Sequence, residues 1–179
     1  PEKRADYLLF YTRDFPIAVI EAKADYKTAG TGMQQAKEYA EILGLKFAYS
    51  TNGKEILEYD YLTGQEKRLE TFPEPAELWA RLRVAQGIKD DIEEKLLAPY
   101  HLLLGKTPRY YQIIAINRTT QAILQNKKRV LITMATGTGK TFVAFQICWK
   151  LWSSKWTRDV KPGKPKILYL ADRYILVDD

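Results

Sequence analysis

The fold is decided by the stretch Met134-Ala135-Thr136-Gly137-Thr138-Gly139-Lys140-Thr141. It directly follows the apolar run 130–133 and directly precedes residues 142–152, whose composition is typical of a packed helix. A strand, a glycine-rich turn and a helix in this order form a phosphate-binding loop, whose backbone N–H groups surround the phosphates of a nucleotide. The lysine reaches the phosphates, and the hydroxyl that follows it holds Mg²⁺. Residues 136–141 are therefore predicted to bind a nucleotide, with Thr141 as a ligand of its Mg²⁺.

The loop departs from the general pattern at one position, because Met134 stands where glycine is expected. This relaxed form resembles motif I of the superfamily 2 helicases and translocases. Upstream, residues 109–112 precede a predicted helix that runs to about Gln125, at the distance where that superfamily has its Q motif. The resemblance implies that Arg109 and Gln112 bind ATP. The resemblance implies that the amide of Gln112, which can donate and accept at once, recognises the adenine edge and selects ATP. The alternative is an ordinary polar surface residue.

Length and composition indicate a globular chain of one domain or two small ones. Of its 179 residues, 46% are hydrophobic and 28% are charged, which excludes a disordered chain. The sequence has no run like a membrane span, and its first residues are unlike a signal peptide. The single cysteine, Cys148, cannot form an internal disulfide. We therefore expect a cytoplasmic protein that does not contact a membrane.

The net charge of +6 is unevenly distributed along the chain. Residues 1–71 hold 10 basic and 12 acidic side chains, whereas residues 99–171 hold 13 basic side chains and one acidic one. The basic half is the half with the phosphate loop. Such a field favours a polyanion, and DNA or RNA is the obvious candidate. A merely soluble basic surface is the alternative.

Residues 7–11 and 16–23 read as two strands of a β-hairpin. In the register that a short central turn would give, Asp6 lies opposite Glu21, and Lys23 shares the face of Glu21. Two carboxylates in this arrangement can hold Mg²⁺, which activates water and stabilises the charge of a phosphodiester under attack. The lysine can orient the water or the transition-state oxygen. A solvated surface ion pair is the alternative.

The arrangement resembles the Asp…Glu-x-Lys core of the PD-(D/E)xK nucleases, which implies that Asp6, Glu21 and Lys23 are catalytic. Residues 33–43 look helical, with Gln35 and Tyr39 on one face. A Gln-x-x-x-Tyr motif after Glu-x-Lys is similar to the RecB-like branch of that family. Gln34 could take the place of Gln35 if the helix is rotated.

The remaining segments fall into a simple order. Two strands are expected at 45–51 and 54–61 around the hairpin signal Asn52-Gly53. Residues 62–75 read as exit turns, and two short helices follow at 76–84 and 88–97. After the phosphate loop and its helix, residues 166–170 are expected to form a buried parallel strand that completes a βαβ unit. Arg173, in a segment that resembles motif Ia, is the predicted DNA-backbone contact, and a surface ion pair is its alternative.

The order of these motifs resembles the restriction subunit of a type I restriction–modification enzyme. The predicted class is α/β: a restriction-endonuclease-like mixed sheet (1–72, lacking its N-terminal part), a helical connector (73–107), and the start of a RecA-like parallel domain (108–179). The resemblance implies a motor that uses ATP to pump double-stranded DNA, and a Mg²⁺-dependent nuclease that cuts unmethylated DNA away from the recognition site. Its partners would be the methylation and specificity subunits.

The later motor motifs, including the Asp-Glu pair that orients the attacking water, are missing from the sequence. We therefore expect a fragment that binds ATP and does not hydrolyse it alone. Three alternatives stay open: a type III restriction subunit, a repair helicase with a degenerate nuclease-like domain, and a DNA-binding module without catalysis.

Overall fold

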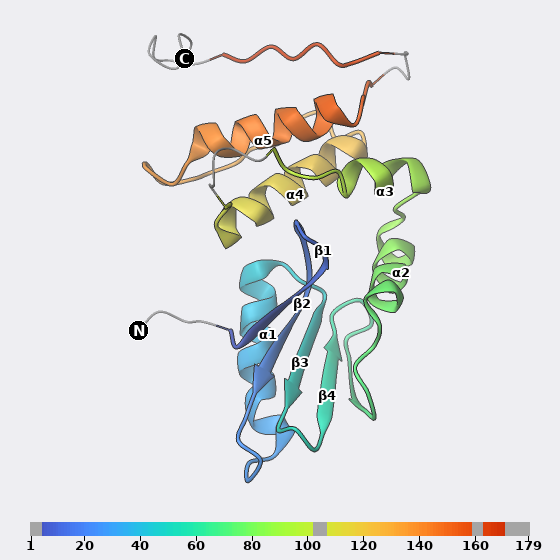
Figure 1. Cartoon of the computed structure of the whole chain (residues 1–179), viewed down its shortest axis with the longest axis vertical. Coiled ribbons are helices and arrows are strands. Elements are labelled where there is room, and N and C mark those ends of the chain that lie inside the picture. Colours follow the sequence, from blue (N-terminus) through green and yellow to red (C-terminus); the bar gives the residue numbers. More distant parts are fainter. Residues whose placement is uncertain (1–4, 102–106, 159–162, 171–179) are drawn as a thin grey trace.

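The computed structural model describes residues 5–101, 107–158 and 163–170 (Figure 1). A sheet backed by helices lies at one end of the molecule, and a group of packed helices lies at the other (Figure 1). The strands are β1 (Tyr7–Thr12), β2 (Phe15–Ala22), β3 (Phe47–Thr51), β4 (Ile56–Asp60) and β5 (Gln65–Leu69). The helices are the 3-10 turn η1 (Ala29–Gly32), α1 (Met33–Leu43), α2 (Pro75–Gln86), α3 (Asp90–Leu96), α4 (Tyr110–Leu124) and α5 (Lys140–Ser153). None of these helices is long and apolar enough to cross a membrane.

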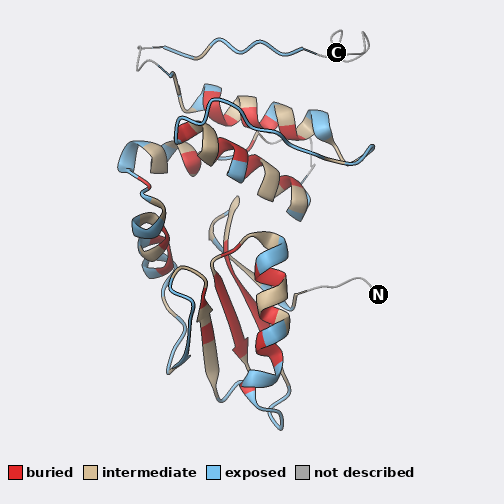
Figure 2. Ribbon diagram, turned by 180° about the vertical axis from the view of Figure 1, so that it is seen from behind, coloured by how far each residue is buried: buried red, intermediate tan, exposed pale blue. Residues whose placement is uncertain are grey.

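The sheet is mixed, and its strands follow the chain order from β1 to β5. Only β2 and β3 run parallel, because η1 and α1 connect them across one face of the sheet. Both strands are buried along most of their length, as covering on two faces requires (Figure 2). Val19 and Ala48 pack under α1, whereas Ile20 and Phe47 belong to the larger core that includes Leu78 of α2.

Glycines and a proline set the ends of the helices. The first helix ends at Gly44, which has φ of +69° and closes a left-handed cap. A β-carbon there would also meet the guanidinium of Arg118, but that flexible side chain could shift, so the positive φ is what favours glycine. The second helix begins with Pro75 at its first turn and ends at Gly87, where φ is +61°.

The sequence-based predictions for the sheet are confirmed in their main points. The hairpin pairs Tyr7 with Ile20 and Leu8 with Val19, which is the expected register, and the irregularities fall nearer the turn. Residues 33–43 form α1 with the expected bounds. The predicted α/β class with a mixed sheet is also confirmed.

Three predictions about strands were wrong. Residues 62–75 are not only turns, since β5 pairs with β4 there. The apolar runs 130–133 and 166–170 are not strands, and Leu131 is 91% exposed and Leu168 is 83% exposed. A strand needs a neighbour for its backbone hydrogen bonds. Within the described part of the chain, no strand lies beside either run.

The hairpin turn joins the sheet to the helices. The carbonyl oxygen of Asp14 accepts hydrogen bonds from the Tyr100 hydroxyl at 3.2 Å and from Nδ2 of Asn117 at 3.1 Å. The carboxylate of Asp14 accepts the backbone N–H of Tyr100 at 3.0 Å. Tyr100 also donates to Oδ1 of Asn117 at 2.9 Å, and both side chains are buried. We call these three residues the hairpin clamp.

A buried lysine completes the region around the hairpin clamp. Lys150 of α5 donates to the carbonyl oxygen of Leu96 at 2.8 Å, and its ammonium lies 4.8 Å from the centre of the Tyr100 ring. Burial lowers the pKa of Lys150 to about 8, although the nearby Asp14 carboxylate raises it. Gln146, also on α5, exchanges hydrogen bonds with the backbone of His101. The polar groups of this segment are therefore largely paired although they are buried.

Tyr100→Phe is predicted to lower the free energy of unfolding by about 1–3 kcal/mol, because it leaves Oδ1 of the buried Asn117 without its donor at nearly unchanged volume. Urea unfolding of wild type and variant measures this. Tyr61→Phe is the matched control: its hydroxyl also donates to a carbonyl, that of Lys37, but at a half-buried position. Equal losses in the two variants would contradict a special contribution of the hairpin clamp.

Candidate functional site

The end of β2 carries a buried carboxylate paired with a lysine. Glu21 is 3% exposed, and its Oε1 accepts the ammonium of Lys23 at 2.6 Å. Alternation along the strand puts both side chains on the face covered by α1. The other oxygen, Oε2 of Glu21, is buried with no hydrogen-bond partner among the described residues. An unpaired buried carboxylate oxygen is costly, so a cation at this atom would be stabilising.

Asp6 lies beside this pair, as the predicted register requires. Its Oδ2 accepts the backbone N–H of Ala22 at 2.8 Å, which anchors the start of β1 to the end of β2. Burial raises the pKa of Glu21 above its usual value, and the charge of Asp6 raises it further against the opposing effect of Lys23. A carboxylate whose pKa is raised by burial and by a neighbouring carboxylate is in an arrangement that a divalent cation relieves.

The first turns of α1 supply the remaining predicted residues. Lys23 donates a second hydrogen bond, at 3.0 Å, to Oε1 of Gln35, and Nε2 of Gln35 donates to the Tyr39 hydroxyl at 2.9 Å. Gln34 is exposed on the same helix. The structure therefore brings together Glu21, Lys23, Gln35 and Tyr39 in one chain of contacts, and it selects Gln35 over Gln34.

Two residues of this site were not identified from the sequence. A β-carbon on Gly32 would lie 2.5 Å from Oγ of Ser50 and 2.9 Å from Cε of Lys23. Ser50 is the β3 residue paired with Glu21, and its hydroxyl donates to the carbonyl oxygen of Ala29 at 2.5 Å. Gly32 and Ser50 thus set the space available to the Glu21 and Lys23 side chains. A Gly-x-Gly before a helix was the only sequence signal, and it did not point to this contact.

Only two carboxylates gather at this site. Among the described residues no group of three or more His, Cys, Asp or Glu side chains could hold a metal ion. Asp6 and Glu21 can nevertheless contribute one carboxylate each, and Mg²⁺ commonly takes only one or two carboxylates with water and substrate phosphate as its other ligands. The residues present therefore fit a Mg²⁺ ion whose remaining ligands are water and a substrate phosphate.

The second predicted site is the phosphate loop. Gly137 and Gly139 have φ of +77° and +84°, a conformation that side chains with a β-carbon rarely adopt. The loop leads into α5 at Lys140, so the positive end of the helix dipole faces it. Nζ of Lys140 lies 3.2 Å from the carbonyl oxygen of Met134 and 3.1 Å from that of Ala135. The ammonium thus lies across the loop, where phosphate oxygens could replace these carbonyls as acceptors.

Gln112 is in contact with the loop itself. Its Nε2 donates to the carbonyl oxygen of Thr138 at 2.9 Å, and its Oε1 accepts the backbone N–H of Arg109 at 2.9 Å. A β-carbon on Gly139 would lie 2.6 Å from Nε2 of Gln112. An amide has two donor and two acceptor positions, so one of each is left for a ligand. The structure places Gln112 as a support of the loop, and its contact with adenine stays a prediction.

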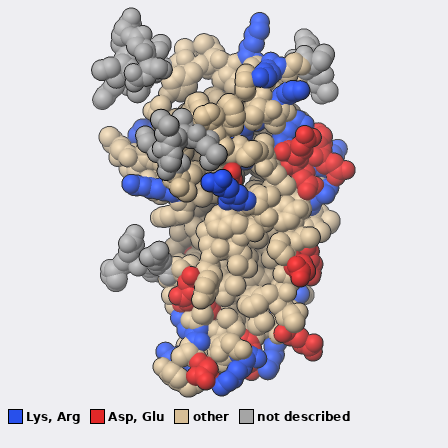
Figure 3. All heavy atoms as spheres, in the orientation of Figure 1, with Lys and Arg blue, Asp and Glu red and all other residues tan. Residues whose placement is uncertain are grey.

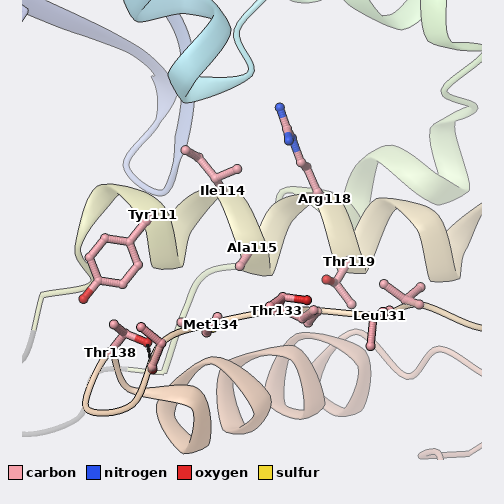
Figure 4. Close-up of a pocket in the computed structure, with 12 residues that line it drawn as sticks. Tyr111, Ile114, Ala115, Arg118, Thr119, Leu131, Thr133, Met134 and Thr138 are labelled. Carbon is pink, nitrogen blue, oxygen red and sulfur yellow. Dashed lines mark hydrogen bonds between the residues drawn. The ribbon is translucent and has the colours of Figure 1, made fainter.

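A cavity of about 420 Å³ adjoins the loop (Figure 4). Tyr111, Ala115 and Thr119 of α4 line one side, and the backbone run that includes Thr133 and Met134 lines the other. Thr138 lies at the loop end of the cavity. Thr136 and Thr141 are exposed at the loop. Arg173, the predicted DNA contact, lies outside the described residues.

Two family models match the two halves of the chain. Residues 1–67 match the family described as type I restriction enzyme R protein N terminus, and residues 105–179 match the family described as type III restriction enzyme, res subunit. The two halves of the chain therefore resemble two different restriction-enzyme families.

Individual relatives specify the family. The chain is 44% identical to the EcoAI endonuclease subunit of a type I restriction enzyme of Escherichia coli, covering 98% of this chain and 22% of that protein. It is 28% identical to the EcoKI endonuclease subunit of Escherichia coli K12, covering 88% and 13%. A solved fragment of an HsdR subunit of a type I restriction enzyme from Vibrio vulnificus is 65% identical, with a TM-score of 0.86 over 93% of this chain and 32% of that one. The chain belongs to the R subunits of type I restriction enzymes and spans about a fifth of the first relative.

Glu21→Gln is predicted to raise the free energy of unfolding at pH 7. Burial raises the pKa of Glu21 in the folded protein above its value of about 4.5 in the unfolded chain. As the pH rises above about 4.5, the unfolded chain therefore releases the Glu21 proton more readily than the folded protein does, and the folded protein loses stability. The gain should disappear below that pH in urea unfolding measured from pH 4 to 8.

Glu58→Gln is the matched control and should show the opposite sign. Burial alone would raise the pKa of Glu58, but hydrogen bonds from Arg81 and Tyr49 outweigh it and lower that pKa. The variant should therefore lose about 3 kcal/mol at pH 7, with a smaller loss in acid. A stability loss at pH 7 in both variants would contradict our account of Glu21.

Gln112→Ala is predicted to weaken ATP binding by the intact subunit about tenfold, since the Thr138 carbonyl loses its donor and the loop its support. Titration with ATP and with GTP separates the two roles: equal losses indicate support of the loop, and a loss confined to ATP indicates adenine recognition. Gln121→Ala is the control, because this α4 side chain bonds to Gln86 instead. Unchanged binding of both nucleotides would contradict both roles.

Proposed function

We propose that the chain is part of an ATP-dependent DNA translocase and endonuclease that cuts unmethylated double-stranded DNA away from its recognition site. The observation that carries this proposal is the presence, in one chain, of the Asp6–Glu21–Lys23–Gln35–Tyr39 cluster and a phosphate loop. The family assignment supports it. The nuclease core would be residues 1–72, the connector 73–107 and the start of the motor 108–179.

In the nuclease, Asp6 and Glu21 would hold Mg²⁺, which when bound activates water for attack on a phosphodiester. Lys23 has two functions in this scheme. Its ammonium neutralises Glu21 and can donate to a substrate phosphate oxygen, while Gln35 and Tyr39 fix its position through their hydrogen bonds. The low exposure of Glu21 strengthens these electrostatic contacts.

In the motor, the phosphate loop would bind ATP with Mg²⁺. Lys140 is placed to reach the phosphates, Thr141 follows it in the first turn of α5, and Gln112 holds the loop from α4. The partners would be double-stranded DNA and the methylation and specificity subunits, in the cytoplasm, with no membrane. DNA recognition would come from those subunits.

Two variants of the intact subunit test the two sites independently. Lys140→Ala should abolish ATP hydrolysis and translocation, because the phosphates lose their cation. Glu21→Ala should leave ATP hydrolysis unchanged and abolish cutting. The measurement is linearisation of a circular plasmid with one unmethylated site, with the partner subunits, Mg²⁺, and with or without ATP.

Retained cutting by Glu21→Ala would exclude the nuclease assignment. ATP hydrolysis without cutting by the wild type would leave a motor whose acidic cluster is only a structural ion network.

A further inference from the structure

Two loops lie at the nuclease end of the sheet, away from α4 and α5 (Figure 1). The first, residues 24–32, starts directly after Lys23 and returns at Gly32, where a β-carbon would touch Lys23 and Glu21. The second, residues 52–55, joins β3 to β4. The first loop therefore packs against the Glu21–Lys23 pair at its end, and the second loop lies at the same end of the sheet.

The two loops are fastened to each other. Nδ2 of Asn52 donates to the carbonyl oxygen of Lys27 at 2.7 Å, and its Oδ1 accepts the backbone N–H groups of Lys54 and Glu55 at 3.0 and 2.8 Å. Asn52 is 8% exposed, although it lies in a hairpin turn. In the first loop, the N–H of Lys27 bonds to the carbonyl oxygen of Ala24 at 2.9 Å and closes a tight turn. The side chains on this turn are thus held at a defined position.

This turn presents Tyr26 to solvent. The side chain is 82% exposed, the most exposed aromatic of the described residues, and no ring or cation contact of it is found among them. A single exposed tyrosine is common and needs no explanation. This one, however, is carried by a buttressed turn three residues from Lys23, so its exposure cannot be attributed to a loose loop.

One cation follows Tyr26 in the sequence, and a second contacts Asp25, which precedes it. Lys27 follows Tyr26, is exposed, and has no ion-pair partner among the described residues. Lys54 of the second loop is 66% exposed and lies 3.4 Å from the carboxylate of Asp25, which is itself 71% exposed. The other acid here, Glu55, is paired with Arg68 at 3.0 Å. Lys, Arg and acidic side chains mingle at this end in Figure 3, and the free charge next to Tyr26 is positive.

We infer that Tyr26, Lys27 and Lys54 bind the DNA strand next to the phosphodiester that is cut. The ring packs on a sugar or an opened base step, and the two ammonium groups contact neighbouring phosphates. This inference rests on the proposed nuclease function and adds the residues that hold its substrate.

Plasmid linearisation by the intact complex tests the inference. Tyr26→Ala should slow cutting about tenfold or more, while ATP hydrolysis and translocation stay at the wild-type rate. Tyr26→Phe keeps the ring and should restore most of the cutting rate. Lys27→Ala should make cutting less sensitive to salt, because each lost phosphate contact reduces the slope of binding against log salt by about 0.9.

Matched controls come from exposed residues far from the loops. Val84→Ala removes a side chain that is 85% exposed on α2, and Lys89→Ala removes an exposed cation before α3. Both should cut like the wild type.

The outcomes distinguish failure of the proposed function from failure of the inference about Tyr26. A wild-type complex that does not cut would overturn the proposed function. If the wild type cuts, cutting by Tyr26→Ala at the wild-type rate would overturn the present inference. So would a Tyr26→Phe variant that is as slow as Tyr26→Ala, or a loss of ATP hydrolysis in Tyr26→Ala that parallels its loss of cutting. Slow cutting with intact ATP hydrolysis and rescue by phenylalanine would support it.

Discussion

The arrangement of this molecule depends on one turn of backbone, the tip of the β1–β2 hairpin. The carbonyl oxygen of Asp14 accepts two partly buried hydrogen bonds, one from Tyr100 and one from Asn117, which lie far along the chain. Each side chain is hydrogen-bonded to the other as well. If the tip moved away, several polar groups would stay buried without partners, at a cost of about 1–3 kcal/mol each. The hairpin clamp therefore fixes the sheet against α4, and the same helix carries Gln112 to the phosphate loop.

Two buried glutamates on opposite faces of the sheet differ in their hydrogen-bond partners and in the direction of their pKa shifts. Glu58, on the face toward α2, is bound by Arg81 with both of its oxygens, and its pKa is lowered although burial opposes this. Glu21, on the face toward α1, keeps one oxygen unpaired, and its pKa is raised. The first carboxylate is satisfied by the protein. The second keeps an unpaired oxygen, as the proposed metal site would require.

Local patterns in the sequence predicted what local physics determines. Alternation and a short turn gave the hairpin register, which put Asp6 beside Glu21, and helical spacing placed Gln35 and Tyr39 on one face. The strand β5 was missed because its residues are polar and mostly exposed, so it shows no hydrophobic alternation. The runs at 130–133 and 166–170 have strand composition, but composition cannot supply a paired neighbour. The hairpin clamp and the Gly32–Ser50 contact join distant residues, and no periodicity marks such contacts.

The uneven charge of the sequence has a structural meaning. A Mg²⁺ site needs carboxylates, whereas a phosphate loop needs cations, and each would neutralise the other at short range. In this fold the Asp6–Glu21 pair lies at the end of the sheet away from α4, and Lys140 begins α5 beyond that helix (Figure 1). Water and salt screen charges beyond roughly 10 Å. The separation would let both proposed sites keep the charge that their chemistry requires, while the turn at Asp14 connects strand β2 to helix α4 through the Asn117 side chain.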